Sequence, residues 1–379
     1  MKFLLSKLFR KKSSSEAVRT VKKKLFSADR WLIVAVFALS LFGVLMVYDS
    51  SVAIGIRDFS DQYYFVREQL KWFVVGIVVF IVCARMQYRV WYTLALPLLF
   101  ITLLLLMAVF IPGIGINALG AHRWINVGLF ILQPAELAKL AMIIYLAAWF
   151  THPEKSRFFS FLLFLAMVVG LVMLEPDLGT SMIILSIAIL LYFFSGAPFR
   201  HFSLLIPLIA LVIGGLALIA PYRMSRLTTF FNPHYDPLGA SYQIRQVLLG
   251  LGSGGLTGVG IGKSRQKYEY LPEANTDSIF AIIGEETGFI GGAIIIFSYM
   301  FIVWRGFRVA SQAPDPFGRL LALGISSWVA VQTIINLGAM VALIPLTGVP
   351  LPFISYGGSS FIVLLLAMGI VSNISKEKS

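Results

Sequence analysis

The chain has 379 residues, of which 58% are hydrophobic and only 13% are charged, whereas a soluble domain carries roughly 25% charged residues. This composition excludes an ordinary soluble domain and predicts an all-α polytopic membrane protein. The net charge of +13 does not indicate a nucleic-acid partner, because ten of the 31 Lys and Arg residues lie in residues 1–30, ahead of the first apolar run.

In chain order, residues 1–30 form a basic tail that we expect to lie in the cytoplasm. Residues 31–374 form a membrane domain with ten apolar runs, and roughly 17–25 apolar residues are enough to cross a bilayer. The runs are Trp31–Tyr48, Leu70–Ala84, Val90–Ile111, Glu136–Phe150, Phe158–Leu174, Ser181–Ser195, Phe202–Ala220, Ser278–Trp304, Leu320–Ile344 and Ser360–Ile374. The second, fourth and sixth are short, so we expect polar turns to extend them, or breaks or tilts around a cavity. Residues 375–379 form a short cytoplasmic tail.

The distribution of Lys and Arg indicates the orientation. With the N-terminus inside, 20 of the 31 fall in the tails and short loops of the cytoplasmic side, as the positive-inside rule requires. We therefore expect both termini to be cytoplasmic. Six of the remaining 11 lie in one long extracytoplasmic loop, 221–277, between the seventh and eighth helices. Long loops escape the rule, and either an anion-binding site or a solvated loop on anionic headgroups explains this cluster.

Several ionisable residues lie at the outer ends of the predicted helices. Glu136 and Lys139 are three residues apart, on one face of the fourth helix and within its first turns. A charge inside a membrane segment costs at least about 2.5 kcal/mol, so such a pair is a candidate functional site. Pro134 followed by Glu136 is also simply a favourable helix start. Asp177, in a Glu-Pro-Asp-Leu-Gly-Thr turn, is a similar candidate, whereas the four histidines show no metal-ligand spacing.

Five motifs occur along the membrane region. They are Gln133-Pro-Ala-Glu-Leu-Ala-Lys139, Pro176-Asp-Leu-Gly-Thr180, Asp236-Pro-Leu-Gly-Ala-Ser-Tyr-Gln243, Gln266-Lys-Tyr-Glu-Tyr-Leu-Pro-Glu-Ala-Asn-Thr-Asp277 and Gly348-Val-Pro-Leu-Pro-Phe-Ile-Ser-Tyr-Gly-Gly-Ser-Ser360. In this order they resemble the SEDS family (shape, elongation, division and sporulation), which includes FtsW, RodA and SpoVE. The fourth motif is more similar to the FtsW and SpoVE members than to RodA.

The resemblance implies a ten-helix peptidoglycan glycosyltransferase that polymerises lipid II into glycan strands at the outer face of the bacterial cytoplasmic membrane, in cell division or cell-shape maintenance. It implies a class B penicillin-binding protein, a transpeptidase, as partner, together with other divisome or elongasome membrane proteins. The family's essential aspartate, in a His-Thr-Asp-Phe motif, matches Asp277. This chain has Asn275 for His, Ser278 for Phe, and Glu175 where Gln usually precedes Pro-Asp-Leu-Gly-Thr, so we expect altered local geometry rather than lost activity.

The residues and the resemblance together suggest one mechanism. Asp277 would act as general base on the sugar 4-hydroxyl of the acceptor, and undecaprenyl pyrophosphate would leave. Cations would offset the pyrophosphate charge, with Glu136 holding Lys139 in place. The candidate substrate-binding residues are Arg123, Glu136, Lys139, Asp177, Arg226, Arg245, Lys263, Lys267 and Glu273. A divalent cation, Mg²⁺ or Mn²⁺, could share this task, because pyrophosphate and carboxylate oxygens suit these ions, but the sequence does not identify its ligands.

Two other functions fit parts of the sequence. A lipid II flippase would use charged helix ends and proline-broken spans for alternating access, but the ionisable residues gather at one membrane face rather than at the midplane. A non-catalytic scaffold for a transpeptidase would need no essential carboxylate. Polymer formation from lipid II separates the three functions, because a flippase moves the lipid without making polymer and a scaffold alone does neither.

Overall fold

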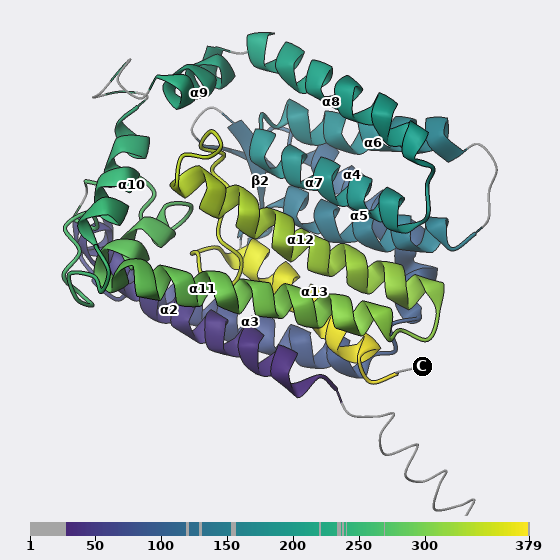
Figure 1. Cartoon of the computed structure of the whole chain (residues 1–379), viewed down its shortest axis with the longest axis horizontal. Coiled ribbons are helices and arrows are strands. Elements are labelled where there is room, and N and C mark those ends of the chain that lie inside the picture. Colours follow the sequence, from purple (N-terminus) through teal and green to yellow (C-terminus); the bar gives the residue numbers. More distant parts are fainter. Residues whose placement is uncertain are drawn as a thin grey trace, which may run out of the picture.

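The computed structural model describes residues 28–118, 121–128, 131–152, 157–219, 221–232, 236, 239, 241–268 and 270–377. Ten helices of this part correspond to the ten predicted spans and form a bundle (Figure 1). They are α2 (Arg30–Phe59), α3 (Tyr64–Arg85), α4 (Val90–Ala108), α5 (Pro134–Phe150), α6 (Arg157–Leu174), α7 (Leu178–Phe194), α8 (Phe199–Ile219), α11 (Ile279–Ser311), α12 (Pro316–Met340) and α13 (Gly358–Ile374). The polytopic helical fold is therefore confirmed, while most of the basic tail lies outside the described residues.

The helices differ in how well their length matches a bilayer. Within the described residues, α2, α4, α6, α11 and α12 are long and apolar enough to cross a membrane. Of the three predicted short spans, α3 reaches 22 residues because a polar turn joins its apolar run, whereas α5 and α7 stay at 17 residues. A helix of that length measures about 25 Å, less than the roughly 30 Å hydrocarbon core. Irregular chain therefore has room at the ends of α5 and α7.

A small antiparallel sheet in the connection between α4 and α5 departs from the all-α expectation. Its strands are β1 (Gly115–Ala118), β2 (Ala121–Asn126) and β3 (Ile131–Leu132), paired in the order β1-β2-β3. The described residues of the connection form no further helix. Hydrogen bonds between neighbouring strands satisfy its backbone instead, because every peptide group needs a partner.

The segment predicted as one long loop between α8 and α11 contains two helices. These are α9 (Pro221–Phe231) and α10 (Tyr242–Ser253). Figure 1 shows both at the left end of the bundle, opposite the C-terminus. The predicted loop is thus a folded layer over one end of the membrane domain.

Helix α11 is broken at Gly288, whose φ of 65° and ψ of −164° are accessible only to glycine. The loop after α10 supplies partners for the backbone at this break. The amides of the two residues after Gly288 donate to the carbonyls of Gly255 and Leu256 at 2.9 and 3.1 Å, and the carbonyls of Glu285 and Glu286 accept from amides further along the loop. The break is therefore filled by chain rather than left open to lipid.

The side chains of the adjacent glutamates in α11 also hold this loop. The carboxylate of Glu286 accepts from the amides of Gly262 and Ser264, both at 3.0 Å. Glu285 accepts from the amide of Arg265 at 3.0 Å and from the Ser264 hydroxyl. Two buried acidic groups in a membrane helix are costly on their own. Here both accept hydrogen bonds from the backbone of the loop.

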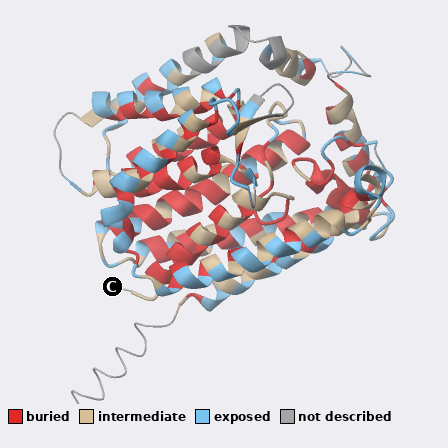
Figure 2. Ribbon diagram, turned by 180° about the vertical axis from the view of Figure 1, so that it is seen from behind, coloured by how far each residue is buried: buried red, intermediate tan, exposed pale blue. Residues whose placement is uncertain are grey.

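The bundle has a buried centre and an apolar exterior. In Figure 2 buried residues fill the middle of the helices, and exposed residues cover their outward faces. Leu163 and Phe297 are 75% and 66% exposed, as expected for residues that face lipid. Inside, α3 and α13 approach closely at Gly369, where an added Cβ would lie 2.7 Å from the carbonyl oxygen of Phe80. Small residues allow such contacts between membrane helices.

Candidate functional site

Asp277 ends the turn that leads into α11. Its side chain is buried, with 7% exposure, and Oδ1 has no hydrogen-bond partner among the described residues. The N-cap of α11 is the next residue, Ser278, so Asp277 does not cap the helix. Buried polar atoms without a partner are rare, and an unpaired carboxylate oxygen keeps its capacity to accept a proton or a hydrogen bond.

Backbone hydrogen bonds fix the turn that carries Asp277. The side-chain amide of Asn336, on α12, donates to the carbonyls of Asp277 and Val349, both at 2.8 Å. The Ser355 hydroxyl and the Tyr356 amide donate to the carbonyls of the two residues before Asp277, at 2.5 and 2.9 Å. Asn336 and the α12–α13 segment therefore hold the backbone of this turn in place, which favours catalysis by a positioned group.

Arg226, from α9, contacts the α12–α13 segment and lies close to Asp277. Its Nη1 donates to the carbonyl of Leu346 at 2.5 Å. A Cβ added at Gly348 would lie 3.9 Å from both terminal guanidinium nitrogens of Arg226 and 3.9 Å from Oδ2 of Asp277. The cation and the carboxylate therefore flank this glycine, whose φ of 71° also favours the absence of a side chain.

The surroundings of Asp277 bring the pKa of its carboxyl close to neutral pH. Burial raises the pKa of the Asp277 carboxyl to about 7, and the nearby charge of Glu273 adds to the rise. Arg226 and Gln243 act in the opposite direction, because they favour the carboxylate. A general base works best when its pKa lies near the working pH, and the pKa of Asp277 satisfies this condition.

A second group of predicted residues lies on the other side of the 346–349 segment. Gly179, in the first turn of α7, packs against Thr347 and Val349. Asp177 caps α7 by accepting from the amide and hydroxyl of Thr180 at 2.9 and 2.8 Å. Arg123, from β2, donates to the carbonyls of the two residues just before Asp177. Here Asp177 and Arg123 shape the wall of the site by binding protein groups.

Glu175, the departure from the usual glutamine, is fully buried, and neither carboxyl oxygen has a partner within the described chain. Burial raises its pKa to about 8, the charge of Asp177 adds to this, and Arg123 opposes it. The carboxyl is therefore protonated at neutral pH. A protonated carboxyl is uncharged, as a glutamine amide is, which lowers the cost of burying glutamate here.

Glu136 and Lys139 form a buried pair inside the bundle. The Lys139 ammonium lies 2.8 Å from Glu136 Oε1 and 3.0 Å from Gln332 Oε1, and it also contacts the Trp328 ring. Gln332 in turn donates to the carbonyl of Pro350 at 2.9 Å. The pair is thus linked to the segment that holds Asp277, although its charges do not lie beside the Asp277 carboxylate.

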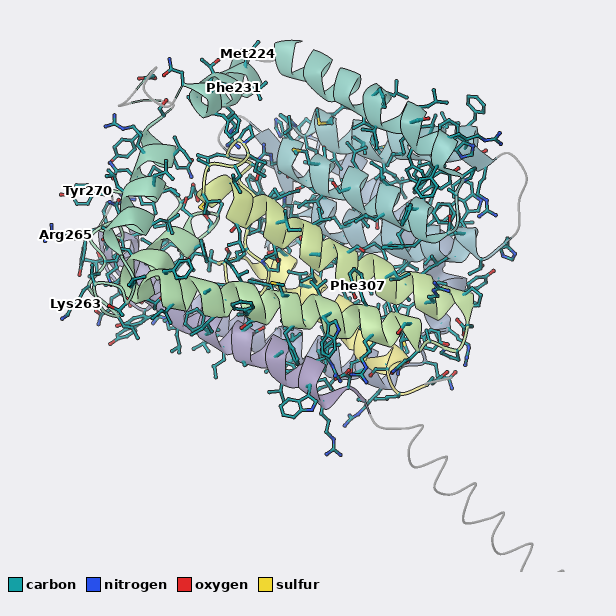
Figure 3. The ribbon with its side chains drawn as sticks, viewed as in Figure 1. Met224, Phe231, Lys263, Arg265, Tyr270 and Phe307 are labelled. Carbon is teal, nitrogen blue, oxygen red and sulfur yellow. The ribbon has the colours of Figure 1, made fainter. Side chains whose placement is uncertain are left out.

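The predicted lysines of the long loop have different surroundings. Lys267 is buried and ion-paired with Asp49 at 2.8 Å and Glu286 at 3.0 Å, so its charge is neutralised inside the protein and we leave it out of the pyrophosphate site. Lys263 is exposed, and Figure 3 shows it with Arg265 at the edge of the molecule. Arg245 is half-buried on α10, the helix that carries Gln243.

The structure thus brings together Asp277, Arg226 and Glu273. Asn336 and the 346–356 segment complete the site; neither was among the predicted site residues, although the fifth motif, Gly348–Ser360, covers most of the segment. Two signals in the sequence could have found them. Asn336 is an amide inside an apolar run, which usually has a purpose, and the segment is rich in glycine and proline. In the described part of the chain, no group of three or more His, Cys, Asp or Glu residues could hold a metal ion.

One cavity borders the Glu175 turn, and another lies at the far ends of the helices. An apolar groove of about 510 Å³ between α4 and α6 is lined by Leu103, Met107, Met167, Gly170, Leu171 and Leu174. It borders the turn of Glu175, because Leu174 is the last residue of α6. A larger cavity lies at the opposite ends of the helices and shares no residue with the Asp277 turn.

The chain is similar to known proteins over nearly its whole length. The family model of the cell cycle proteins FtsW, RodA and SpoVE matches residues 30–379. Stage V sporulation protein E of Bacillus subtilis is 42% identical over 359 residues, which cover 92% of this chain and 97% of that protein. A probable peptidoglycan glycosyltransferase FtsW of Geobacter metallireducens is 41% identical over 359 residues, covering 93% and 96%.

Solved structures show the same fold. A chain of a peptidoglycan synthase complex, studied for its coordination of polymerization and crosslinking, superimposes with a TM-score of 0.77 at 27% identity, covering 92% of this chain and 98% of that one. The rod shape determining protein RodA of Thermus thermophilus gives a TM-score of 0.70 at 28% identity, covering 93% and 98%.

Proposed function

Because the chain belongs to the FtsW, RodA and SpoVE family of cell cycle proteins, we infer that it is a peptidoglycan glycosyltransferase, and we propose that Asp277 is its general base. The observation that carries this proposal is the Asp277 carboxyl, which is buried, stands on a turn fixed by backbone hydrogen bonds, has no hydrogen-bond partner at Oδ1 among the described residues, and has a pKa of about 7. The substrate we propose is lipid II.

The proposed reaction joins two glycan units. The 4-hydroxyl oxygen of the acceptor attacks the anomeric carbon of the donor, and a new C–O bond forms there. The bond between that carbon and the pyrophosphate oxygen breaks, so the electron pair leaves with undecaprenyl pyrophosphate. Asp277 takes the hydroxyl proton and later releases it to solvent. A positioned base commonly contributes about 10²–10⁴-fold to the rate.

Arg226 is the cation best placed to support the leaving group. It lies across Gly348 from Asp277, and a guanidinium can form paired, charge-assisted hydrogen bonds to phosphate oxygens. Lys263 and Arg245 add positive charge in the covering layer. We propose that these three residues offset the growing charge on pyrophosphate.

A divalent cation also fits the residues present. Glu273 offers an exposed carboxylate near Asp277, and Mg²⁺ is commonly held by one or two carboxylates together with substrate phosphates. The ion would supply further charge neutralisation for pyrophosphate. We therefore propose an ion shared with the substrate rather than a site built by the protein alone.

We place the polyprenyl tail in the apolar groove between α4 and α6. Contacts link the groove to the site, because Leu174 adjoins the Glu175 turn and the start of α7 packs on Thr347 and Val349. An apolar groove suits an isoprenoid chain, while the pyrophosphate would remain near Arg226. We further propose a class B penicillin-binding protein as partner, which agrees with the synthase complex among the structural relatives.

The test of the function is polymerisation by the protein alone. Purified protein, reconstituted in lipid and supplied with lipid II, should produce glycan chains without a transpeptidase. Transfer of lipid II across the bilayer without polymer would instead indicate a flippase. Absence of both activities would indicate a scaffold.

We expect polymerase activity to rise with pH through a midpoint near 7, because only the deprotonated Asp277 can accept the hydroxyl proton. Between pH 6 and 8 the deprotonated fraction changes by roughly tenfold for such a pKa. Glu273→Gln should move the midpoint to lower pH, since it removes a charge that raises the pKa of Asp277. Arg226→Gln should move it to higher pH. The measurement is the pH profile of kcat/KM for each variant. If both variants shifted the midpoint in the same direction, or neither shifted it, the assignment of this midpoint to Asp277 would be wrong.

We propose that the Asp277 end of the bundle faces outward and that both termini are cytoplasmic. Ile261, in the loop after α10, is 80% exposed, and the chain's single cysteine, Cys83, is buried. A cysteine at Ile261 should therefore react with an impermeant maleimide on intact spheroplasts. A cysteine at Ser311, exposed at the far end of α11, should react only after permeabilisation. The reverse pattern would invert the proposed topology.

A further inference from the structure

The larger of the two cavities described above lies far from the chemistry proposed for Asp277. It has a volume of about 790 Å³ and is formed where α5 and α7 end and α6 and α8 begin. Ligand sites commonly occupy roughly 300–1,000 Å³, so the cavity is large enough for a small molecule or a headgroup. Asp277 lies at the opposite helix ends, and the proposed polymerase reaction does not use this cavity.

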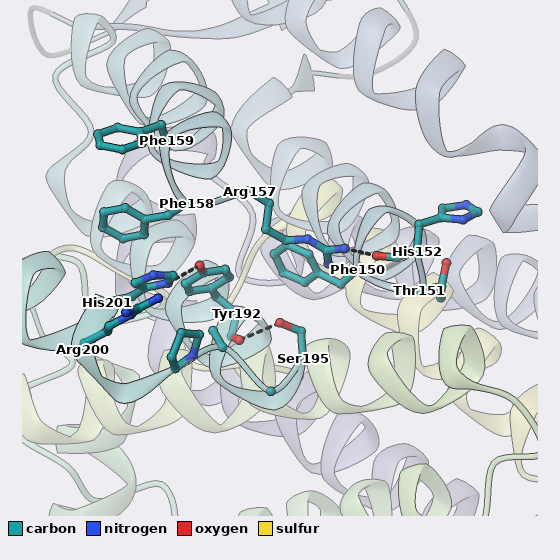
Figure 4. Close-up of a pocket in the computed structure, with 13 residues that line it drawn as sticks. Phe150, Thr151, His152, Arg157, Phe158, Phe159, Tyr192, Ser195, Arg200 and His201 are labelled. Atoms are coloured by element: carbon teal, nitrogen blue, oxygen red, sulfur yellow. Dashed lines mark hydrogen bonds between the residues drawn. The ribbon is translucent and has the colours of Figure 1, made fainter. Parts of the chain in front are cut away.

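One wall of the cavity is a continuous group of rings. Figure 4 shows Tyr192 between His201 on one side and Phe150 on the other. The centroids of Tyr192 and His201 are 5.9 Å apart with nearly parallel planes, those of Tyr192 and Phe150 are 5.7 Å apart, and Phe158 lies 4.5 Å from His201. The Tyr192 hydroxyl and His201 Nδ1 are 2.7 Å apart. This hydrogen bond orients the imidazole and leaves Nε2 for another partner.

The ionisable side chains among the described residues that line the cavity are all basic. Arg157, Arg200, His152 and His201 line it, and none of its lining residues in the described chain is an aspartate or glutamate. Arg157 donates through Nη2 to the carbonyl of His152, as Figure 4 shows. Its Nε is shielded from solvent and has no hydrogen-bond partner in the described structure. A shielded guanidinium donor without a protein partner suits an acceptor oxygen of a bound anion.

We propose that this cavity binds the phosphate-bearing headgroup of an anionic glycerophospholipid. Phosphate oxygens would satisfy Arg157 Nε and pair with the guanidinium of Arg200. Basic pockets between membrane helices at the cytoplasmic side commonly bind anionic headgroups, and this is the cytoplasmic end in the topology proposed above. Phe159 in the cavity wall and Phe199 at the start of α8 are both 78% exposed. These outward apolar side chains would contact acyl chains, which favours a lipid over a soluble phosphate.

The experiment measures lipid binding to the purified, delipidated protein by native mass spectrometry. Phosphatidylglycerol should bind in preference to phosphatidylcholine. Arg157→Gln combined with Arg200→Gln should lower the phosphatidylglycerol affinity by roughly tenfold or more, since hydrogen bonds to charged groups are lost. A matched control, Arg308→Gln with Arg319→Gln, removes two cations from the same end of the bundle outside the cavity. It should bind phosphatidylglycerol as the wild type does.

A second variant keeps the test decisive if the arginine variant does not fold. Ala197→Phe leaves all the cations in place and fills the cavity that Ala197 lines, so it should also lose the preference. Equal binding of the two lipids by the wild type, or an unchanged preference in either cavity variant, would overturn the proposal. Glycerol 3-phosphate or inorganic phosphate binding as tightly as phosphatidylglycerol would show that the occupant is a soluble phosphate, and the lipid assignment would fail.

Discussion

Replacing Asp277 with asparagine is expected to lower glycan polymerisation by about 10²–10⁴-fold, the usual contribution of a general base. The amide keeps the size of the side chain but cannot take a proton at neutral pH. Folding should survive, because the contacts that fix this turn involve backbone carbonyls. The rate of polymer formation from lipid II, with a monodisperse elution profile as the folding check, is the measurement.

Two comparisons sharpen this test. Asp58→Asn removes an exposed carboxylate at the end of α2 and should leave polymerisation unchanged. Asp277→Glu keeps the carboxylate but displaces it by about 1 Å, which is enough to cost much of the rate when geometry is critical. A well-folded Asp277→Asn protein with substantial polymerase activity would exclude the base role. Recovery of its activity by added Mn²⁺ would assign Asp277 to metal binding instead.

Lys139→Met is expected to destabilise the protein by about 3–5 kcal/mol, the usual cost of leaving one partner of a buried ion pair alone. The variant would leave Glu136 charged and unpaired in the bundle, where Lys139 is now only 1% exposed. Polymerisation should fall as well, because Lys139 holds Gln332, which binds the carbonyl of Pro350 in the segment beside Asp277. Thermal unfolding followed by tryptophan fluorescence measures the first effect.

The matched control for this pair removes both charges together. Glu136→Gln with Lys139→Met leaves no buried ion and should regain most of the lost stability, since replacing a buried pair by neutral groups is often nearly neutral. Activity that returns with stability would show that the pair acts by supporting the fold. Stability without activity would restore Lys139 as a substrate-handling residue. Single and double variants of equal stability would contradict the buried pairing.

The sequence contains enough information to predict the helices and the key carboxylate. Apolar runs mark each span, and the motif that ends at Asp277, through its family resemblance, marks the carboxylate that we propose as the base. The proximity of Arg226 to Asp277 could not be predicted, because it depends on how α9 folds back onto the 346–349 segment. The sequence also does not show that Lys263 is exposed whereas Lys267 is buried in an ion pair. The second is neutralised by Asp49, which lies 218 residues away.

The break in α11 has a consequence for the order in which the protein is built. A bare peptide group in the hydrocarbon region costs several kcal/mol, so a helix interrupted at Gly288 cannot be inserted cheaply by itself. Its hydrogen-bond partners, Gly255 and Leu256, precede it in the chain and leave the ribosome first. Synthesis from the N-terminus therefore delivers the loop before the gap that it must fill. A rearranged chain in which α11 is made before α10 should reach the membrane with its break unfilled, and should be degraded more readily even though every native contact remains available to it.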